Sequence, residues 1–192
     1  YQVNSRLTIT NGGRVFAGQL WQGTTGNVVT VTGPGSYLRL TADFALSGYN
    51  TDGRASNALW ISDGGVLNGA GASFAGGQVT ITGAGSAFSN AGAVSVGGNY
   101  NSVLVDAGGK ITFNSLTVSG SSNTLTFSGP GGLLRVPAAA TFSLGGFANS
   151  MTFSNGAALD IGYGSGFSVG NGGTNNSLNI GGLGRKSTRL NS

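Results

Sequence analysis

The sequence predicts an all-β fold, a parallel β-helix (β-solenoid) of about eight rungs with three short strands in each rung. The main observation is that two related phrases alternate along the chain. The LTITNGG phrase occupies residues 7–13 and recurs at 59–65, 103–109 and 151–157, and the VTVTGPGS phrase occupies 29–36 and recurs at 79–86 and 125–132. Such self-similarity is typical of a solenoid, because one repeat cannot bury its apolar face alone.

The composition supports a folded, glycine-rich chain. Glycine accounts for 38 of the 192 residues without a Gly-X-Y period, which excludes collagen. Only 7% of the residues are charged and 39% are hydrophobic, the reverse of the balance in disordered chains. The glycines are therefore predicted to occupy turns of a single domain, residues 1–184.

Several residue types needed for common chemistries are missing. The chain has no cysteine and no histidine, which excludes disulfides, thiol catalysis and zinc-thiolate sites. The glycine doublets lack the helix and the Lys-Ser/Thr of a phosphate loop, and the calcium-binding GGxGxD repeat is absent. No apolar run approaches the roughly 18 residues of a transmembrane helix. We therefore predict no cofactor and no metal site.

Each rung begins with an apolar residue that opens an alternation of apolar and polar positions. These anchors are Leu7, Val29, Leu59, Val79, Val103, Leu125, Met151 and Leu178. Alternation with period two predicts a strand with one buried face. A glycine-rich turn follows, then a second strand (for example 38–40, 111–113 and 133–136) and a third (44–48, 94–97, 116–118, 142–145 and 167–170). With rungs about 4.8 Å apart, we expect a rod of roughly 35–40 Å, right-handed and triangular in section.

An asparagine recurs two residues before most anchors. The six residues at this position are Asn27, Asn57, Asn101, Asn123, Asn149 and Asn176. Asparagine tolerates left-handed backbone and bonds to its own turn, and stacked amides can bond along a rod. We predict a structural asparagine ladder; the alternative is a polar row that binds a ligand.

The carboxylates do not form a catalytic pattern. Acid/base catalysis on polysaccharides needs clustered carboxylates. The chain has only Asp43, Asp52, Asp63, Asp106 and Asp160, which fall in different columns when counted from their anchors. Asp63 belongs to a DGG turn, as Asn11 belongs to an NGG turn. We therefore predict no catalytic residue and no enzyme activity in this segment.

Two basic residues share a predicted column. Arg39 and Arg135 each lie ten residues after their anchors, with Ser89 at the same step between them. Four rungs, roughly 19 Å, separate them. They could contact separate groups of a long acidic polymer, or they could simply be solvated.

Exposed aromatic residues are a second candidate contact. The first outward position of strand 1 is mostly threonine, but Trp60 and Leu104 interrupt it. The interruptions weigh against ice binding by a threonine array, which stays an alternative. Trp60 and Leu104, together with Trp21 and Tyr37, could stack on sugar rings or contact another protein. The alternative for Trp60 is that it packs under the connection 48–56. The candidate surface contacts are Trp21, Tyr37, Arg39, Trp60, Leu104 and Arg135.

The alternating phrases resemble the passenger regions of bacterial autotransporters, which contain motifs such as NSLTISNGG and VTVTGAGS. The matching segments are 4–13, 29–36, 57–65, 79–86, 93–97 and 175–181, and the resemblance covers nearly all of residues 1–184. The resemblance implies a secreted rod on the bacterial cell surface that serves as an adhesin or spacer. Such a rod is normally followed by an outer-membrane β-barrel, and only the barrel contacts the membrane. The implied partners are a glycan or protein receptor, or further copies of the rod, and not nucleic acid. A polysaccharide-active β-helix enzyme with its active site outside this segment is the alternative.

The two ends of the chain are expected to be incomplete or non-native. The chain starts at Tyr1 and not at Met, so we expect an internal fragment of a longer protein. Residues 185–192 read RKSTRLNS, break the repeat and back-translate to codons that resemble a sequencing adapter; the alternative is a natural basic tail. Without this tail, six basic residues face five aspartates, a net charge of +1 (6 − 5), in place of +4. The basic balance then indicates no nucleic-acid or lipid partner.

Overall fold

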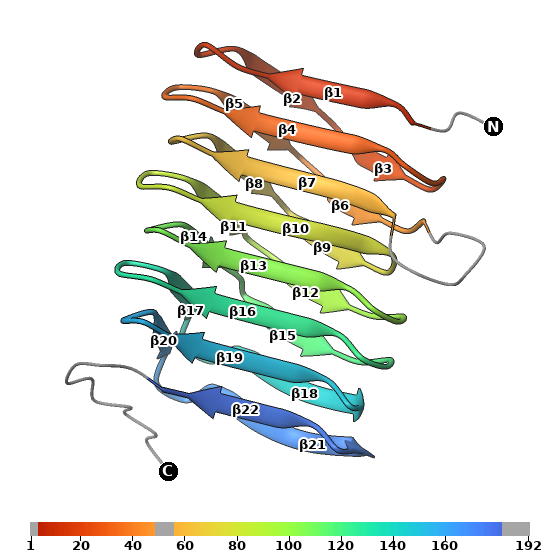
Figure 1. Ribbon diagram of the computed structural model, residues 1–192, viewed down its shortest axis with the longest axis vertical. Helices are drawn as coiled ribbons and strands as arrows, with labels where there is room; N and C mark the ends of the chain where they lie inside the picture. Colours follow the sequence, from red (N-terminus) through yellow and green to blue (C-terminus); the bar gives the residue numbers. More distant parts are fainter. Residues whose placement is uncertain (1–3, 49–55, 182–192) are drawn as a thin grey trace.

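The chain folds as a β-solenoid, as predicted. The structure, a computed structural model, describes residues 4–48 and 56–181. These residues form β-strands that coil into a stack of parallel rungs (Figure 1). They contain no helix long and apolar enough to cross a membrane. The predicted tail 185–192, Asp52 and most of the connection proposed to cover Trp60 lie outside the described residues.

Every rung adds one strand to each of three parallel sheets. Sheet A contains β1 (Arg6–Ile9), β4 (Val28–Thr32), β7 (Asn57–Ser62), β10 (Gly77–Thr82), β13 (Ser102–Asp106), β16 (Thr124–Ser128), β19 (Ser150–Ser154) and β22 (Ser177–Ile180). Sheet B contains β2 (Arg14–Ala17), β5 (Tyr37–Leu40), β8 (Val66–Gly69), β11 (Ala87–Asn90), β14 (Lys110–Thr112), β17 (Leu133–Val136) and β20 (Ala158–Ile161). Sheet C contains β3 (Leu20–Gln22), β6 (Asp43–Leu46), β9 (Gly71–Phe74), β12 (Ala93–Val96), β15 (Ser115–Val118), β18 (Thr141–Phe147) and β21 (Gly166–Thr174).

The described residues form seven complete rungs, and β22 is the first strand of an eighth. The register of sheet A agrees with the predicted anchors: Leu7 pairs with Val29, and Val29 pairs with Leu59. Along β4, Val29 and Val31 are buried whereas Thr30 between them is half-buried. The alternation therefore sends one face of each strand into the rod.

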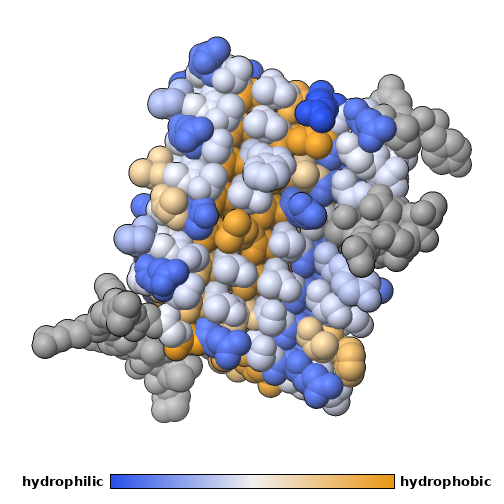
Figure 2. Space-filling model, viewed as in Figure 1, coloured by the Kyte–Doolittle hydropathy of each residue, from blue (hydrophilic) through white to orange (hydrophobic). Residues whose placement is uncertain are grey.

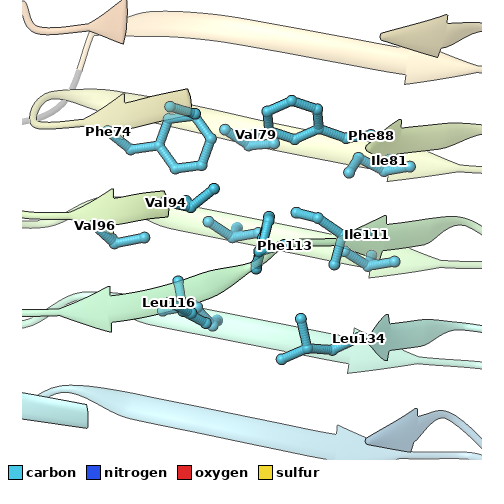
Figure 3. Close-up of a cluster of buried hydrophobic side chains, with 14 of the residues drawn as sticks. Phe74, Val79, Ile81, Phe88, Val94, Val96, Ile111, Phe113, Leu116 and Leu134 are labelled. Carbon is cyan, nitrogen blue, oxygen red and sulfur yellow. The ribbon is translucent and has the colours of Figure 1, made fainter. Parts of the chain in front are cut away.

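Apolar side chains from all three sheets fill the interior of the rod (Figure 3). Phe88 of sheet B is fully buried, and its ring lies 6.4 Å from the ring of Phe44 and 6.1 Å from that of Phe74, both in sheet C. Burying one large apolar side chain stabilises a fold by about 1.5–3 kcal/mol. Because the column continues from rung to rung, the core extends through the stack.

Two kinds of tight turn alternate between sheets A and B. In the NGG-type turn, Asn11 and Gly12 both have positive φ, 54° and 76°, which is the signature of a type I′ turn. In the GPG-type turn, Pro34 precedes Gly35, whose φ is 78°, as in a type II turn. The two sequence phrases thus encode two backbone conformations.

The unlike turns interlock, which explains why the repeat unit is a pair of rungs. The buried hydroxyl of Ser36 accepts a hydrogen bond from the backbone N–H of Gly12 at 3.1 Å, and Ser86 accepts one from Gly64 at 3.0 Å. A Cβ added to Gly35 would approach the Cα of Gly12 to 3.5 Å. The serine of one turn therefore satisfies a backbone donor of the other, and glycine permits their close stacking.

Candidate functional site

The asparagines ahead of the anchors are joined along the rod mainly through the backbone. The side-chain oxygen of each accepts a hydrogen bond from the backbone N–H one rung earlier. The donor and acceptor pairs are Ser5 to Asn27 (2.9 Å), Asn27 to Asn57 (2.9 Å), Gly77 to Asn101 (2.9 Å), Asn101 to Asn123 (2.8 Å), Asn123 to Asn149 (2.8 Å) and Asn149 to Asn176 (3.0 Å). Two side-chain amides bond directly only between Asn101 and Asn123, at 2.9 Å, within the described residues.

The left-handed backbone in this row belongs to a different position from the one expected. The residue immediately before the asparagine has positive φ in several rungs, for example Tyr100 at 59° and Ser122 at 57°. The row is interrupted at Gly77, where an added Cβ would lie 2.6 Å from Cδ1 of Leu46. Asn57, Asn123 and the other row members up to rung seven are buried, so their amides serve the backbone and present no surface to a ligand.

The six candidate contact residues lie on three different faces of the rod. Trp60 and Leu104 belong to sheet A, and Trp21 belongs to sheet C. Tyr37, Arg39 and Arg135 belong to sheet B. The structure therefore does not bring all six together, and one compact ligand cannot contact them all.

The outer face of sheet A is mostly uncharged, since Arg6 and Asp106 are the only charged residues in its described strands. Thr30, Trp60 and Thr80 lie side by side in one column, and Leu104 follows in the next rung. Trp60 is 44% exposed and Leu104 is half-buried. Figure 2 shows this face: columns of residues of intermediate hydropathy run along it with hydrophobic residues between them, and strongly hydrophilic residues lie mostly towards its edges.

Trp21 stands alone on sheet C. Its side chain is 70% exposed, and its Nε1–H donates to the hydroxyl of Ser47 at 2.9 Å. This bond fixes the indole on the neighbouring rung. No other candidate contact residue accompanies it on that face.

Sheet B carries a groove of about 540 Å³ that crosses four rungs. Its wall includes Tyr37 and Arg39 of β5, Asn68 of β8, Ser89 of β11 and Thr112 of β14. A second hollow of about 440 Å³, which includes Phe16 of β2, shares Arg39 and Thr41 with it. Arg39 therefore lies between two adjoining depressions of one face.

The aromatic and polar groups of this groove support one another. The side-chain N–H of Asn68 donates to the Tyr37 hydroxyl at 2.8 Å. The Tyr37 ring meets the Phe16 ring edge to face, with centroids 6.0 Å apart, and Phe16 is 64% exposed. Counting from the anchors missed Phe16 and Asn68, because the connection that contains a type I′ turn is one residue shorter than the connection that contains a G-P-G turn.

The same miscount hid an ion pair. Arg39 and Arg135 do lie in one column of sheet B, which runs through Asn68, Ser89 and Thr112. Asp160, nine residues after its anchor, pairs in register with Arg135, and their side chains form an ion pair of 3.3 Å. Counting residues from the anchors puts Asp160 one step away from Arg135, and this placement is wrong, because the two residues are paired in register.

Basic residues are concentrated on sheet B. The described residues include five, of which Arg6 lies in sheet A and four lie in sheet B: Arg14, Arg39, Lys110 and Arg135. All four sheet B residues are exposed. Among the described residues, the carboxylate of Asp160 next to Arg135 makes the one ion pair of this face.

The carboxylates of the described residues do not converge. Asp63 occupies its type I′ turn with a φ of 51°, as Asn11 and Asn155 do in theirs. Over residues 4–48 and 56–181, no three His, Cys, Asp or Glu side chains gather where they could hold a metal ion.

Comparison with known proteins gives no match: no protein-family model, no curated protein and no solved structure is similar to this chain.

Proposed function

We propose that this chain is a non-catalytic segment of an autotransporter-like passenger, a β-helical rod displayed on the bacterial cell surface as an adhesin or spacer. The observation that carries the proposal is the unbroken stacking of three parallel sheets through seven rungs around one continuous core. At about 4.8 Å per rung, this stack extends roughly 34 Å, and each added rung lengthens it without a new kind of contact.

The mechanism is reach combined with repeated weak contact. A rod of stacked rungs presents outward side chains at a regular spacing, so a repetitive receptor can engage several rungs at once. Linked weak contacts raise the overall affinity well beyond that of one contact. The exposed residues of sheet B, including Phe16 and Arg39, offer such a face.

Surface display is tested by labelling cells. An antibody raised against the purified chain should label intact cells that carry the gene as strongly as permeabilised cells. An antibody against a cytosolic protein is the matched control and should label permeabilised cells only. Labelling of the rod that also requires permeabilisation would overturn the proposed location.

The non-catalytic role is tested with the purified chain and a panel of polysaccharides. We expect beads coated with the chain to adhere to at least one polysaccharide layer, with adhesion rising more steeply than the coating density. We also expect no release of reducing ends. Sustained release of reducing ends would favour the alternative of a polysaccharide-active enzyme.

A further inference from the structure

We propose that the outer face of sheet B binds a polysaccharide that carries carboxylate groups, and that Arg39 recognises a carboxylate of that polymer. The inference rests on the proposed adhesin function and names the ligand class of its binding face. Its site is the groove lined by Tyr37, Arg39, Asn68, Ser89 and Thr112, together with the adjoining hollow at Phe16.

The shape of the site fits an extended polymer. The groove crosses β5, β8, β11 and β14, which are successive strands of sheet B. Three rung spacings correspond to about 14 Å along the rod, enough for several linked sugar rings. The hollow at Phe16 continues the depression by one rung towards β2, so a chain laid along the rod can extend past Arg39 in both directions.

The aromatic and amide groups favour sugar rings over a polyanion without rings. Phe16 exposes its ring, and Tyr37 meets it edge to face, so the pair offers an apolar surface to the C–H face of a sugar. The bond from Asn68 holds the Tyr37 hydroxyl in place. The Asn68 carbonyl and the hydroxyls of Ser89 and Thr112 can exchange hydrogen bonds with sugar hydroxyls.

The charges identify the acidic class of polysaccharide. Arg14, Arg39 and Lys110 are exposed and have no carboxylate partner in residues 4–48 and 56–181. The planar fork of a guanidinium matches a carboxylate with two parallel hydrogen bonds. Arg39 lies inside the groove, whereas Arg135, in the same column, is already neutralised by Asp160. The binding charge is therefore centred on Arg39.

This difference between two arginines of one column provides the experiment. Binding of polygalacturonate to the full 192-residue chain is measured by isothermal titration calorimetry, together with the Arg39→Gln and Arg135→Gln variants. We expect Arg39→Gln to weaken binding about tenfold, because a charge-assisted hydrogen bond is lost. We expect Arg135→Gln, the matched control, to change binding by less than about twofold. Circular dichroism confirms that each variant is folded.

A third variant should gain affinity. Asp160→Asn removes the carboxylate that neutralises Arg135 and extends the free positive charge along the column. We expect binding to strengthen by only about twofold, since Arg135 does not line the groove and its contact with the polymer would be screened by solvent. All binding should weaken as salt concentration rises.

Four results would overturn the inference. Equal losses in Arg39→Gln and Arg135→Gln would show that the groove does not centre recognition on Arg39. Equal affinity for the methyl-esterified polymer would show that carboxylates are not recognised, and equal affinity for polyglutamate would show that sugar rings are not. If polygalacturonate does not bind while intact cells are labelled, the ligand class is wrong and the surface rod stands.

Discussion

Replacing Asn123 with alanine should destabilise its own rung and the two beside it by about 4 kcal/mol. Asn123 is fully buried, and its side chain makes four hydrogen bonds. Its Oδ1 accepts from the backbone N–H of Asn101 at 2.8 Å and from the side-chain N–H of Asn101 at 2.9 Å. Its Nδ2 donates to the carbonyls of Ser119 at 2.7 Å and Gly98 at 3.1 Å.

The magnitude follows from the number of bonds and the burial. One intramolecular hydrogen bond contributes about 1 kcal/mol net, and alanine removes four of them. Alanine also leaves the buried N–H of Asn101 without an acceptor. The loss should stay near the mutated rung, because each repeat of a solenoid contacts only its neighbours.

Native-state hydrogen exchange measures this local loss. A fall of about 4 kcal/mol in the free energy of local unfolding would speed hydrogen exchange of the Asn101 amide about a thousandfold. The exchange rates of the amides in β1 and β4 should change little. Asn114→Ala makes the same substitution at an exposed side chain and should cost less than about 0.5 kcal/mol. Equal exchange at the Asn101 amide in the two variants would refute the structural role of the row.

Three further substitutions, the first with a matched control, probe the turns and the core, and each is measured by chemical denaturation. Gly120→Ala should lower the free energy of unfolding by about 3 kcal/mol or more, because the added Cβ would overlap the Gly98 carbonyl and the backbone φ is 77°. Gly97→Ala is the control and should be neutral, since the atom nearest to its added Cβ lies 3.7 Å away. Phe88→Ala should lower the free energy of unfolding by about 4 kcal/mol. Unchanged stability would show that the ring cluster around Phe88 is not tightly packed. Asn90→Leu should raise the free energy of unfolding by about 1–2 kcal/mol, since both polar atoms of this buried amide lack a hydrogen-bond partner. A lower free energy of unfolding would mean that the amide forms hydrogen bonds.

The fold was largely predictable because its signals are local. The alternation around Val29 and Val31 predicts a strand with one buried face, and the structure buries both side chains. The NGG phrase predicts a turn with left-handed residues, and Asn11 and Gly12 adopt positive φ. The pairing of one anchor with the next then follows from stacking equal units.

The candidate site was predictable only in part. Tyr37 and Arg39 follow a G-P-G turn, and sequence counting placed Arg39 correctly in one column with Arg135. Phe16 and Asn68 follow connections that are one residue shorter, so the same count put them one step away from the column that they share with Arg39. The groove became visible only when these unequal turns were aligned.

The sequence by itself determined the kind of object: an all-β rod of stacked rungs with glycine-rich turns and a row of asparagines. The tertiary structure alone decided how side chains from different rungs meet. It placed Asp160 beside Arg135, interrupted the asparagine row where Leu46 leaves no room for a Cβ at Gly77, and separated Trp60 from Tyr37 on different faces. The physical reason is that strand and turn formation depend on neighbouring residues, whereas alignment between rungs depends on how many residues lie in each connection between paired strands.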